Sequence, residues 1–156
     1  MVESVEFAKF ILSRATVQNI PMGETKLHKL LYICDGFMLA LGFNFIEERA
    51  KAWNYGPVYP KVRKWLEKTP DAFTSPHECK KETVKKINHI GAEKLVDFIL
   101  STYGKWTAAA LSLWSHEPNS PWELAISYSG GSMNSPINKT DMKNYFKTFL
   151  KNEKNL

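Results

Sequence analysis

Hydrophobic residues recur every three or four positions in six stretches of the chain, which is the spacing of one face of an α-helix. The first stretch covers residues 4–16, and its apolar stripe is formed by Val5, Ala8, Ile11, Leu12 and Ala15. The second covers residues 25–42 and ends at Gly42, a residue typical of helix stops. Its stripe is formed by Leu27, Leu30, Leu31, Cys34, Met38 and Leu41.

Four more helices are predicted from this spacing along the rest of the chain. One begins between Val58 and Pro60, because a proline is tolerated in a helix only in the first turn. Residues 92–103 and 107–114 form the next two, the latter with Thr107 as its cap. The last begins near Thr140, with an apolar face formed by Met142, Tyr145, Phe146, Phe149 and Leu150.

Two segments lack the helical pattern. Residues 43–54 alternate weakly on either side of a charged turn, which predicts a small β-hairpin or an irregular insertion. Residues 68–90 are polar, basic and poorly periodic, which predicts a connecting loop with at most a short strand. We therefore expect a mainly α, compact helical bundle forming one domain over residues 1–152, with a frayed tail at 153–156.

The composition is that of a globular protein whose many aromatic side chains exceed what the core needs, so that some are available to contact a partner. The chain has 156 residues, of which 44% are hydrophobic, and it carries five Trp, six Tyr and nine Phe. The N-terminus lacks the apolar run of a signal peptide, and the most apolar stretch, residues 31–43, is too short to span a membrane and contains Asp35. Two cysteines, Cys34 and Cys79, are too few for an oxidised scaffold, so a reducing cytoplasm is expected.

The net charge of +5 is concentrated in two segments. Residues 78–86 carry +2 and residues 139–156 carry +3, so the remainder is balanced. Within the second segment, Lys143, Lys147 and Lys151 recur every four residues and line one face of the last predicted helix. An ordinary solvated surface gives the same pattern. Nucleic-acid binding through this basic helix, by a phage or mobile-element regulator, is therefore kept as an alternative.

The stretch LWSHEPNSPWELA, residues 111–123, places Ser115, His116 and Glu117 side by side. On a helix such neighbours point about 100° apart and cannot form a proton relay. A helix junction explains the residues better. Pro118 ends one helix, and the next begins with Ser120 as N-cap, followed by Pro121 and Glu123. We expect no catalytic residues, and a hydrolase that uses His116 ranks last among the functions considered.

Other chemical sites are weakly supported. His77, Glu78 and Cys79 with His89 lack the paired spacing of a zinc site, and Glu47 and Glu48 lie in a charged turn. The Gly- and Ser-rich residues 127–136 match no phosphate-binding motif and predict a turn or mobile loop. No metal and no cofactor are expected.

Three segments together resemble a known family. They are LHKLLYICDGFMLAL (27–41), AWNYGPVYPKVRKW (52–65) and ALSLWSHEPNSPWELA (110–125). In order, spacing and content they are similar to the Panacea domain of SocA-like antitoxins, which includes GepA-type phage-associated proteins. Related sequences often have amide or apolar residues at the positions of His28 and Cys34-Asp35, so this chain departs from them there.

The resemblance implies a non-catalytic protein that neutralises a toxin encoded nearby by binding it. In the SocA type, it implies delivery of the toxin to a cytoplasmic AAA+ protease. Binding hot spots favour aromatic residues, so Trp53, Tyr55 and Tyr59 around the Gly-Pro turn are the candidate contacts, together with Lys143, Lys147 and Lys151. The alternative is that these aromatic residues pack the hairpin onto the helices. Packing is favoured over surface contact for Trp53, and the two roles are equally supported for Tyr59.

Overall fold

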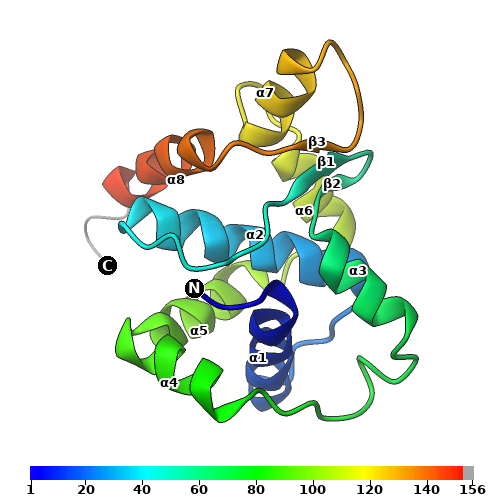
Figure 1. Ribbon diagram of the computed structural model, residues 1–156, viewed down its shortest axis with the longest axis vertical. Coiled ribbons are helices and arrows are strands. Elements are labelled where there is room, and N and C mark those ends of the chain that lie inside the picture. The colour runs from blue at the N-terminus through cyan, green and yellow to red at the C-terminus, as the bar shows by residue number, and fades with distance from the viewer. Residues whose placement is uncertain (153–156) are drawn as a thin grey trace.

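The computed structural model describes residues 1–152 and is organised around helix α2 (Glu24–Ala40). This helix crosses the centre of the molecule and contacts α1, α3, α5, α6, α8 and strand β2 (Figure 1). Every residue from Leu27 to Leu39 is buried, including the charged ones. A helix enclosed on all sides buries more than one stripe, so the predicted stripe understates its burial.

Helices that are far apart in sequence cover the two sides of α2. Helices α1 (Ser4–Val17) and α5 (Ala92–Tyr103) lie on one side, and α8 (Lys139–Asn152) lies on the other (Figure 1). The two helices approach closely at Gly36, where an added Cβ would lie 2.1 Å from ring atoms of Phe146. Glycine at this position therefore lets α8 pack directly on the backbone of α2.

A three-stranded antiparallel sheet lies at one end of α2, in the order β2-β1-β3. It consists of β1 (Lys51–Trp53), β2 (Gly56–Val58) and β3 (Ser135–Pro136). Strand β1 pairs with both neighbours, with Lys51 opposite Val58 on one side and opposite Pro136 on the other. The sheet thus joins segments that are about eighty residues apart in sequence.

The prediction of a small hairpin or irregular insertion near residues 43–54 is confirmed in outline: residues 43–50 are largely irregular, and the hairpin that follows has its turn at residues 54–55. The segment predicted to be a turn or mobile loop, residues 127–136, is turn over most of its length, but its last two residues form β3. The charged residues read as a turn serve another purpose. Glu48 accepts hydrogen bonds from the Ser4 hydroxyl (2.7 Å) and from the backbone N–H of Lys61 (2.8 Å). Glu48 therefore connects α1 to the first turn of α3 (Pro60–Glu67).

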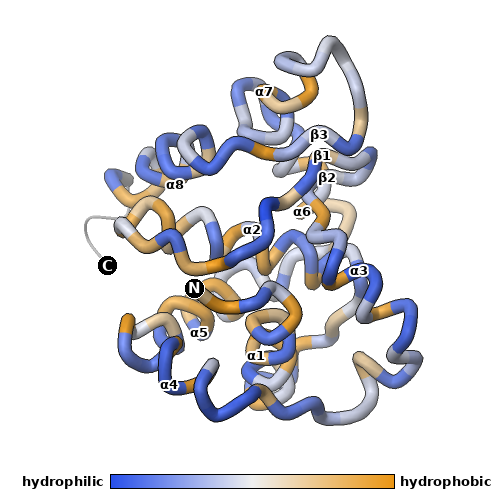
Figure 2. The backbone as a smooth tube through the Cα atoms, viewed as in Figure 1, coloured by the Kyte–Doolittle hydropathy of each residue, from blue (hydrophilic) through white to orange (hydrophobic). Residues whose placement is uncertain are grey.

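The loop predicted for residues 68–90 contains a helix, α4 (Lys81–His89). The segment from the end of α3 through α4 is largely hydrophilic (Figure 2). Only Thr83 and Ile87 of α4 are buried. One i,i+4 pair in nine residues is too short a pattern to indicate a helix, which is why the prediction failed.

The remaining helices agree with the predictions. Helix α3 begins at Pro60, α6 (Ala108–Ser115) is capped by Thr107, and α7 (Pro121–Tyr128) is capped by Ser120. The mainly α architecture is confirmed. Within residues 1–152, no helix combines the length and apolar character needed to cross a membrane. The expected tail at 153–156 lies outside the described residues.

Candidate functional site: a cationic pocket beside the hairpin

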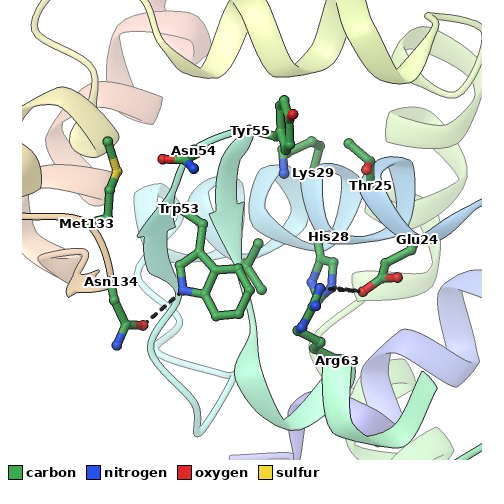
Figure 3. A pocket seen from close by; sticks show the side chains of 11 residues that line it. Glu24, Thr25, His28, Lys29, Trp53, Asn54, Tyr55, Arg63, Met133 and Asn134 are labelled. Atoms are coloured by element: carbon green, nitrogen blue, oxygen red, sulfur yellow. Dashed lines mark hydrogen bonds and ion pairs between the residues drawn. The ribbon is translucent and has the colours of Figure 1, made fainter. Parts of the chain in front are cut away.

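A pocket of about 430 Å³ opens where the hairpin β1–β2 meets helices α2 and α3 (Figure 3). Helix α2 supplies its floor, the hairpin and the 133–134 segment supply one wall, and α3 supplies the other. The lining includes two side chains that are almost fully buried, His28 and Lys29. Polar groups at such depth need partners, so their hydrogen bonds describe the pocket's chemistry.

His28 is a lining residue of the pocket whose ring carries one hydrogen-bond donor. Its side chain is 2% exposed, and Nδ1 accepts a hydrogen bond from the backbone N–H of Tyr59 at 3.2 Å. Burial, aided by the charges of Lys29 and Arg63, lowers the pKa of His28 to about 3, so the ring is neutral. The ring proton therefore lies on Nε2. This nitrogen has no hydrogen-bond partner among the described residues.

Lys29 is a buried cation. The residue is 1% exposed, and Nζ donates a 3.0 Å hydrogen bond to the carbonyl oxygen of Pro57. Burial lowers the pKa of Lys29 to about 8, which leaves the amine mainly protonated at neutral pH. In residues 1–151, no carboxylate oxygen lies within 4.0 Å of Nζ. A buried charge without a counter-ion is costly, and it marks a place where an anion would be stabilised.

Arg63 and Trp53 form the more open part of the pocket (Figure 3). The guanidinium of Arg63 lies 5.0 Å from the centre of the Trp53 ring, a cation–π arrangement, and its NH1 lies 3.2 Å from Oε1 of Glu24. The indole N–H of Trp53 donates to Oδ1 of Asn134 at 2.9 Å. Trp53 is thus fixed on both sides while remaining half-buried.

The predicted aromatic contacts occupy three different environments. Tyr55, at the hairpin turn, is 74% exposed and lies on the pocket's rim together with the exposed Met133. Trp53 both lines the pocket and packs within the hairpin region. Tyr59 is fully buried, and its hydroxyl donates to Asp35. The surface role considered for Tyr59 is therefore wrong, because its side chain is a core residue.

The residues of the 111–123 stretch join the hairpin to the helices. Nε2 of His116 lies 2.8 Å from the carbonyl oxygen of Asn54, and Nδ1 contacts the carbonyl oxygen of Ser112. The Ser115 hydroxyl also donates to the Ser112 carbonyl, at 2.7 Å, so it does not face the imidazole. Glu117 instead accepts from the Tyr145 hydroxyl. These three consecutive side chains do not form a relay.

The other candidate residues lie away from the pocket. Lys147 and Lys151 are exposed on α8 and Lys143 is half-buried there. Cys79 donates through Sγ to the carbonyl oxygen of Glu6, and His77 contacts the carbonyl oxygen of Asp71. Over the described part of the chain, no group of three or more His, Cys, Asp or Glu is placed to hold a metal ion.

Sequence reasoning noted His28 as unusual but did not identify Glu24, Lys29 or Arg63 as site residues. One signal was present: Lys29 lies between Leu27 and Leu30, two residues of the apolar stripe of the second predicted helix. A lysine at a position enclosed by apolar neighbours is rarely buried without a partner. The hydrogen bond from Lys29 to the hairpin, however, joins residues that are far apart in sequence.

The protein is thus small and helical, and its cationic pocket lies beside an exposed aromatic rim. Residues 27–123 match the family described as "Antitoxin SocA-like, Panacea domain", and the chain belongs to that family. It is similar to Antitoxin SocA of Caulobacter vibrioides (strain NA1000 / CB15N), with 25% identity over 144 residues that cover 85% of this chain and 74% of that protein. No solved structure matches the chain significantly.

The comparisons confirm the resemblance based on three sequence motifs. Those motifs correspond to α2, to the hairpin with α3, and to the junction of α6 with α7. The first two form the floor and most of the walls of the pocket. The third holds the hairpin turn through His116. The three segments on which the resemblance is based therefore build and support the pocket.

Proposed function

We propose that this protein is an antitoxin that acts in the cytoplasm by binding a protein toxin encoded beside it, and that the pocket and its aromatic rim form part of the contact surface. The supporting observation is the pocket itself. Among the described residues, it holds a buried ammonium with no carboxylate in contact and an imidazole N–H with no hydrogen-bond partner, beneath an exposed tyrosine, in a chain of the SocA-like antitoxin family.

The energetics favour an interface at this end of the molecule. A protein partner that covers the pocket would exclude water from Trp53 and Tyr55, and large aromatic side chains in such positions carry much of the binding energy of interfaces. The same partner would supply acceptors to Lys29 and His28, whose desolvation the fold has already imposed. The unbound protein is thus preorganised for binding.

Co-expression with the neighbouring reading frame tests the proposal. That product should arrest growth when expressed alone, and the antitoxin should restore growth and co-purify with it. Tyr55→Ala should weaken both effects, with about tenfold or greater loss of affinity. Tyr128→Ala is the matched control, because Tyr128 is 72% exposed on α7 and does not line the pocket.

Three outcomes separate the possibilities. A harmless neighbour, or rescue without any physical complex, would contradict neutralisation by binding. Equal losses from Tyr55→Ala and Tyr128→Ala would contradict the assignment of the surface. If the toxin disappears from rescued cells but persists in cells that lack an AAA+ protease, neutralisation proceeds through degradation, as the SocA-type resemblance implies.

A further inference from the structure

We infer that the pocket binds the carboxylate of an aspartate or glutamate side chain of the partner protein, with Lys29, His28 and Arg63 as its donors. This inference rests on the proposed function, since it specifies the chemical group that the partner inserts. Three observations lead to it: the unpaired donors on the floor, an internal carboxylate that already occupies the pocket's mouth, and the net charge of the lining.

The floor provides donors in excess of the acceptors present. An ammonium has three N–H bonds, and the described residues give Lys29 one hydrogen bond, to Pro57. Nε2–H of His28 has none among the same residues. Both residues line the same pocket, and neither is exposed beyond 2%. A carboxylate has two oxygens, one for each donor, and a charge-assisted hydrogen bond is the stronger kind.

Glu24 shows that a carboxylate fits at this position. Its Oε1 lies 3.2 Å from NH1 of Arg63 and 3.8 Å from Nε2 of His28 (Figure 3). Glu24 stands in the first turn of α2 with its side chain 43% exposed, so it can rotate into solvent. Its own carboxylate reaches Arg63 but remains too far from His28 for a hydrogen bond. A carboxylate from above would compete with Glu24 for Arg63 and reach the floor.

The charge of the lining selects a monoanion. Lys29 and Arg63 are positive, Glu24 is negative, and His28 is neutral because burial depresses its pKa. The surplus is one positive charge. A phosphate group carries about −1.5 to −2 at neutral pH, which exceeds this surplus. A side-chain carboxylate matches the surplus, while Trp53 and Tyr55 cover its methylene groups and the neighbouring residues.

A titration without the toxin tests the pocket chemistry directly. Glutamate blocked as its N-acetyl N-methylamide is added to the 15N-labelled protein, and the indole N–H signal of Trp53 is followed. We expect a saturable shift at millimolar concentrations that blocked glutamine does not produce. Arg63→Gln should abolish the shift, and Lys64→Gln, which removes a charge from the same helix outside the pocket, should preserve it. No shift in the wild type, or equal shifts with glutamine, would overturn the inference.

The decisive variant is Glu24→Gln, which removes the competing charge while keeping the side chain's size. It should bind blocked glutamate several-fold more tightly than the wild type does. A structural role for the Glu24–Arg63 pair predicts the opposite, since losing the pair would disorder Arg63. Weaker binding in Glu24→Gln would therefore overturn the inference, provided that the thermal midpoint shows the variant to be folded.

Affinity for the neighbouring toxin separates this inference from the proposed function. Arg63→Gln should weaken the complex about tenfold, Lys64→Gln should leave it unchanged, and Glu24→Gln should strengthen it. If wild type binds the toxin and none of the three variants differs, the toxin docks elsewhere: the inference is overturned and the proposed function stands. If wild type binds no toxin, the proposed function fails, and the titration alone decides whether the pocket recognises carboxylates.

Discussion

The hydroxyl of Tyr59 donates a 2.8 Å hydrogen bond to Oδ2 of Asp35, and both side chains are completely buried. Tyr59 precedes the first residue of α3, whereas Asp35 lies in the middle of α2. Burial raises the pKa of Asp35 to about 6, although the bond from Tyr59 opposes this rise. With its backbone N–H bonded to His28, Tyr59 fixes the end of the hairpin to the floor of the pocket.

Tyr59→Phe should destabilise the protein by about 1.5–3 kcal/mol at pH 8, because it removes the donor from a buried carboxylate. At pH 5, below the pKa of about 6, Asp35 is mainly protonated, so the same variant should cost less. Urea unfolding at both pH values measures the difference. Tyr128→Phe, on the exposed face of α7, should be neutral at both. If Tyr59→Phe lowered the free energy of unfolding equally at pH 8 and pH 5, the lost hydrogen bond to the Asp35 carboxylate would not explain the destabilisation.

This pairing also shows where sequence reasoning stops. The helical stripe of α2 was predictable because periodicity is local, and the caps at Thr107 and Ser120 were predictable from residue type. The stripe could not reveal that α8 covers the opposite side, so Asp35 was not recognised as a core residue. Its partner is twenty-four residues away. The pocket has the same origin, because Lys29 and Pro57 meet only in the folded chain.

His28 makes the stability of the folded protein depend on pH, and the direction of its pKa shift gives the sign of this dependence. Its pKa falls from 6.5 to about 3 on folding, so between these values the unfolded chain binds a proton that the folded chain does not. Its contribution to stability is therefore complete above pH 6.5 and is lost as the pH falls, by about 1.4 kcal/mol per pH unit. Asp35 acts oppositely: its pKa rises from 3.8 to about 6, so its protonation favours the folded state as the pH falls through this range.

The two contributions should nearly cancel between about pH 4 and 6, and His28→Gln should separate them. Glutamine offers an acceptor to the Tyr59 N–H but does not titrate. The stability of the variant relative to the wild type should increase as the pH falls from 7 to 4.5, as measured by urea unfolding in matched buffers. A difference that stays constant over this range would mean that His28 accepts its proton normally in the folded protein.

Gly56 is required for the hairpin on two counts. Its φ of +111° is unfavourable for other residues, and an added Cβ would lie 2.4 Å from Oγ of Ser115 and 2.6 Å from Cε of Lys29. Gly42 has a similar φ of +98° but open space around it. Gly56→Ala should therefore be more destabilising than Gly42→Ala by about 1–3 kcal/mol. The difference in stability between the two variants, measured by thermal or urea unfolding, isolates the cost of the steric clash at Gly56. Equal losses would indicate that the hairpin shifts to accommodate the added methyl group at little cost.

Nucleic-acid binding through α8 remains a separate prediction. Short duplex DNA should bind weakly at low salt, and binding should vanish near physiological ionic strength, because a few exposed lysines give only a salt-sensitive attraction. Replacing Lys143, Lys147 and Lys151 with glutamine should remove the low-salt binding in a fluorescence anisotropy titration. Tight, sequence-dependent binding at physiological salt would instead support the regulator alternative.

Ser120 carries two hydrogen bonds at the junction of α6 and α7. Its Oγ accepts from the backbone N–H of Glu123 at 3.2 Å and donates to the carbonyl oxygen of Ser115 at 3.1 Å, and the residue is 1% exposed. Ser120→Ala should cost about 1–3 kcal/mol, more than the ~1 kcal/mol expected for Thr107→Ala at the exposed cap of α6.

Ser120→Asp distinguishes the two bonds, since a carboxylate accepts from Glu123 but cannot donate to the carbonyl of Ser115. It should therefore be at least as destabilising as Ser120→Ala, because the new charge would be buried against a carbonyl oxygen. Urea unfolding of the three variants at pH 7 provides the comparison. If Ser120→Asp matched the wild type, capping alone would explain the residue, and the bond to Ser115 would contribute nothing to the junction that holds the hairpin.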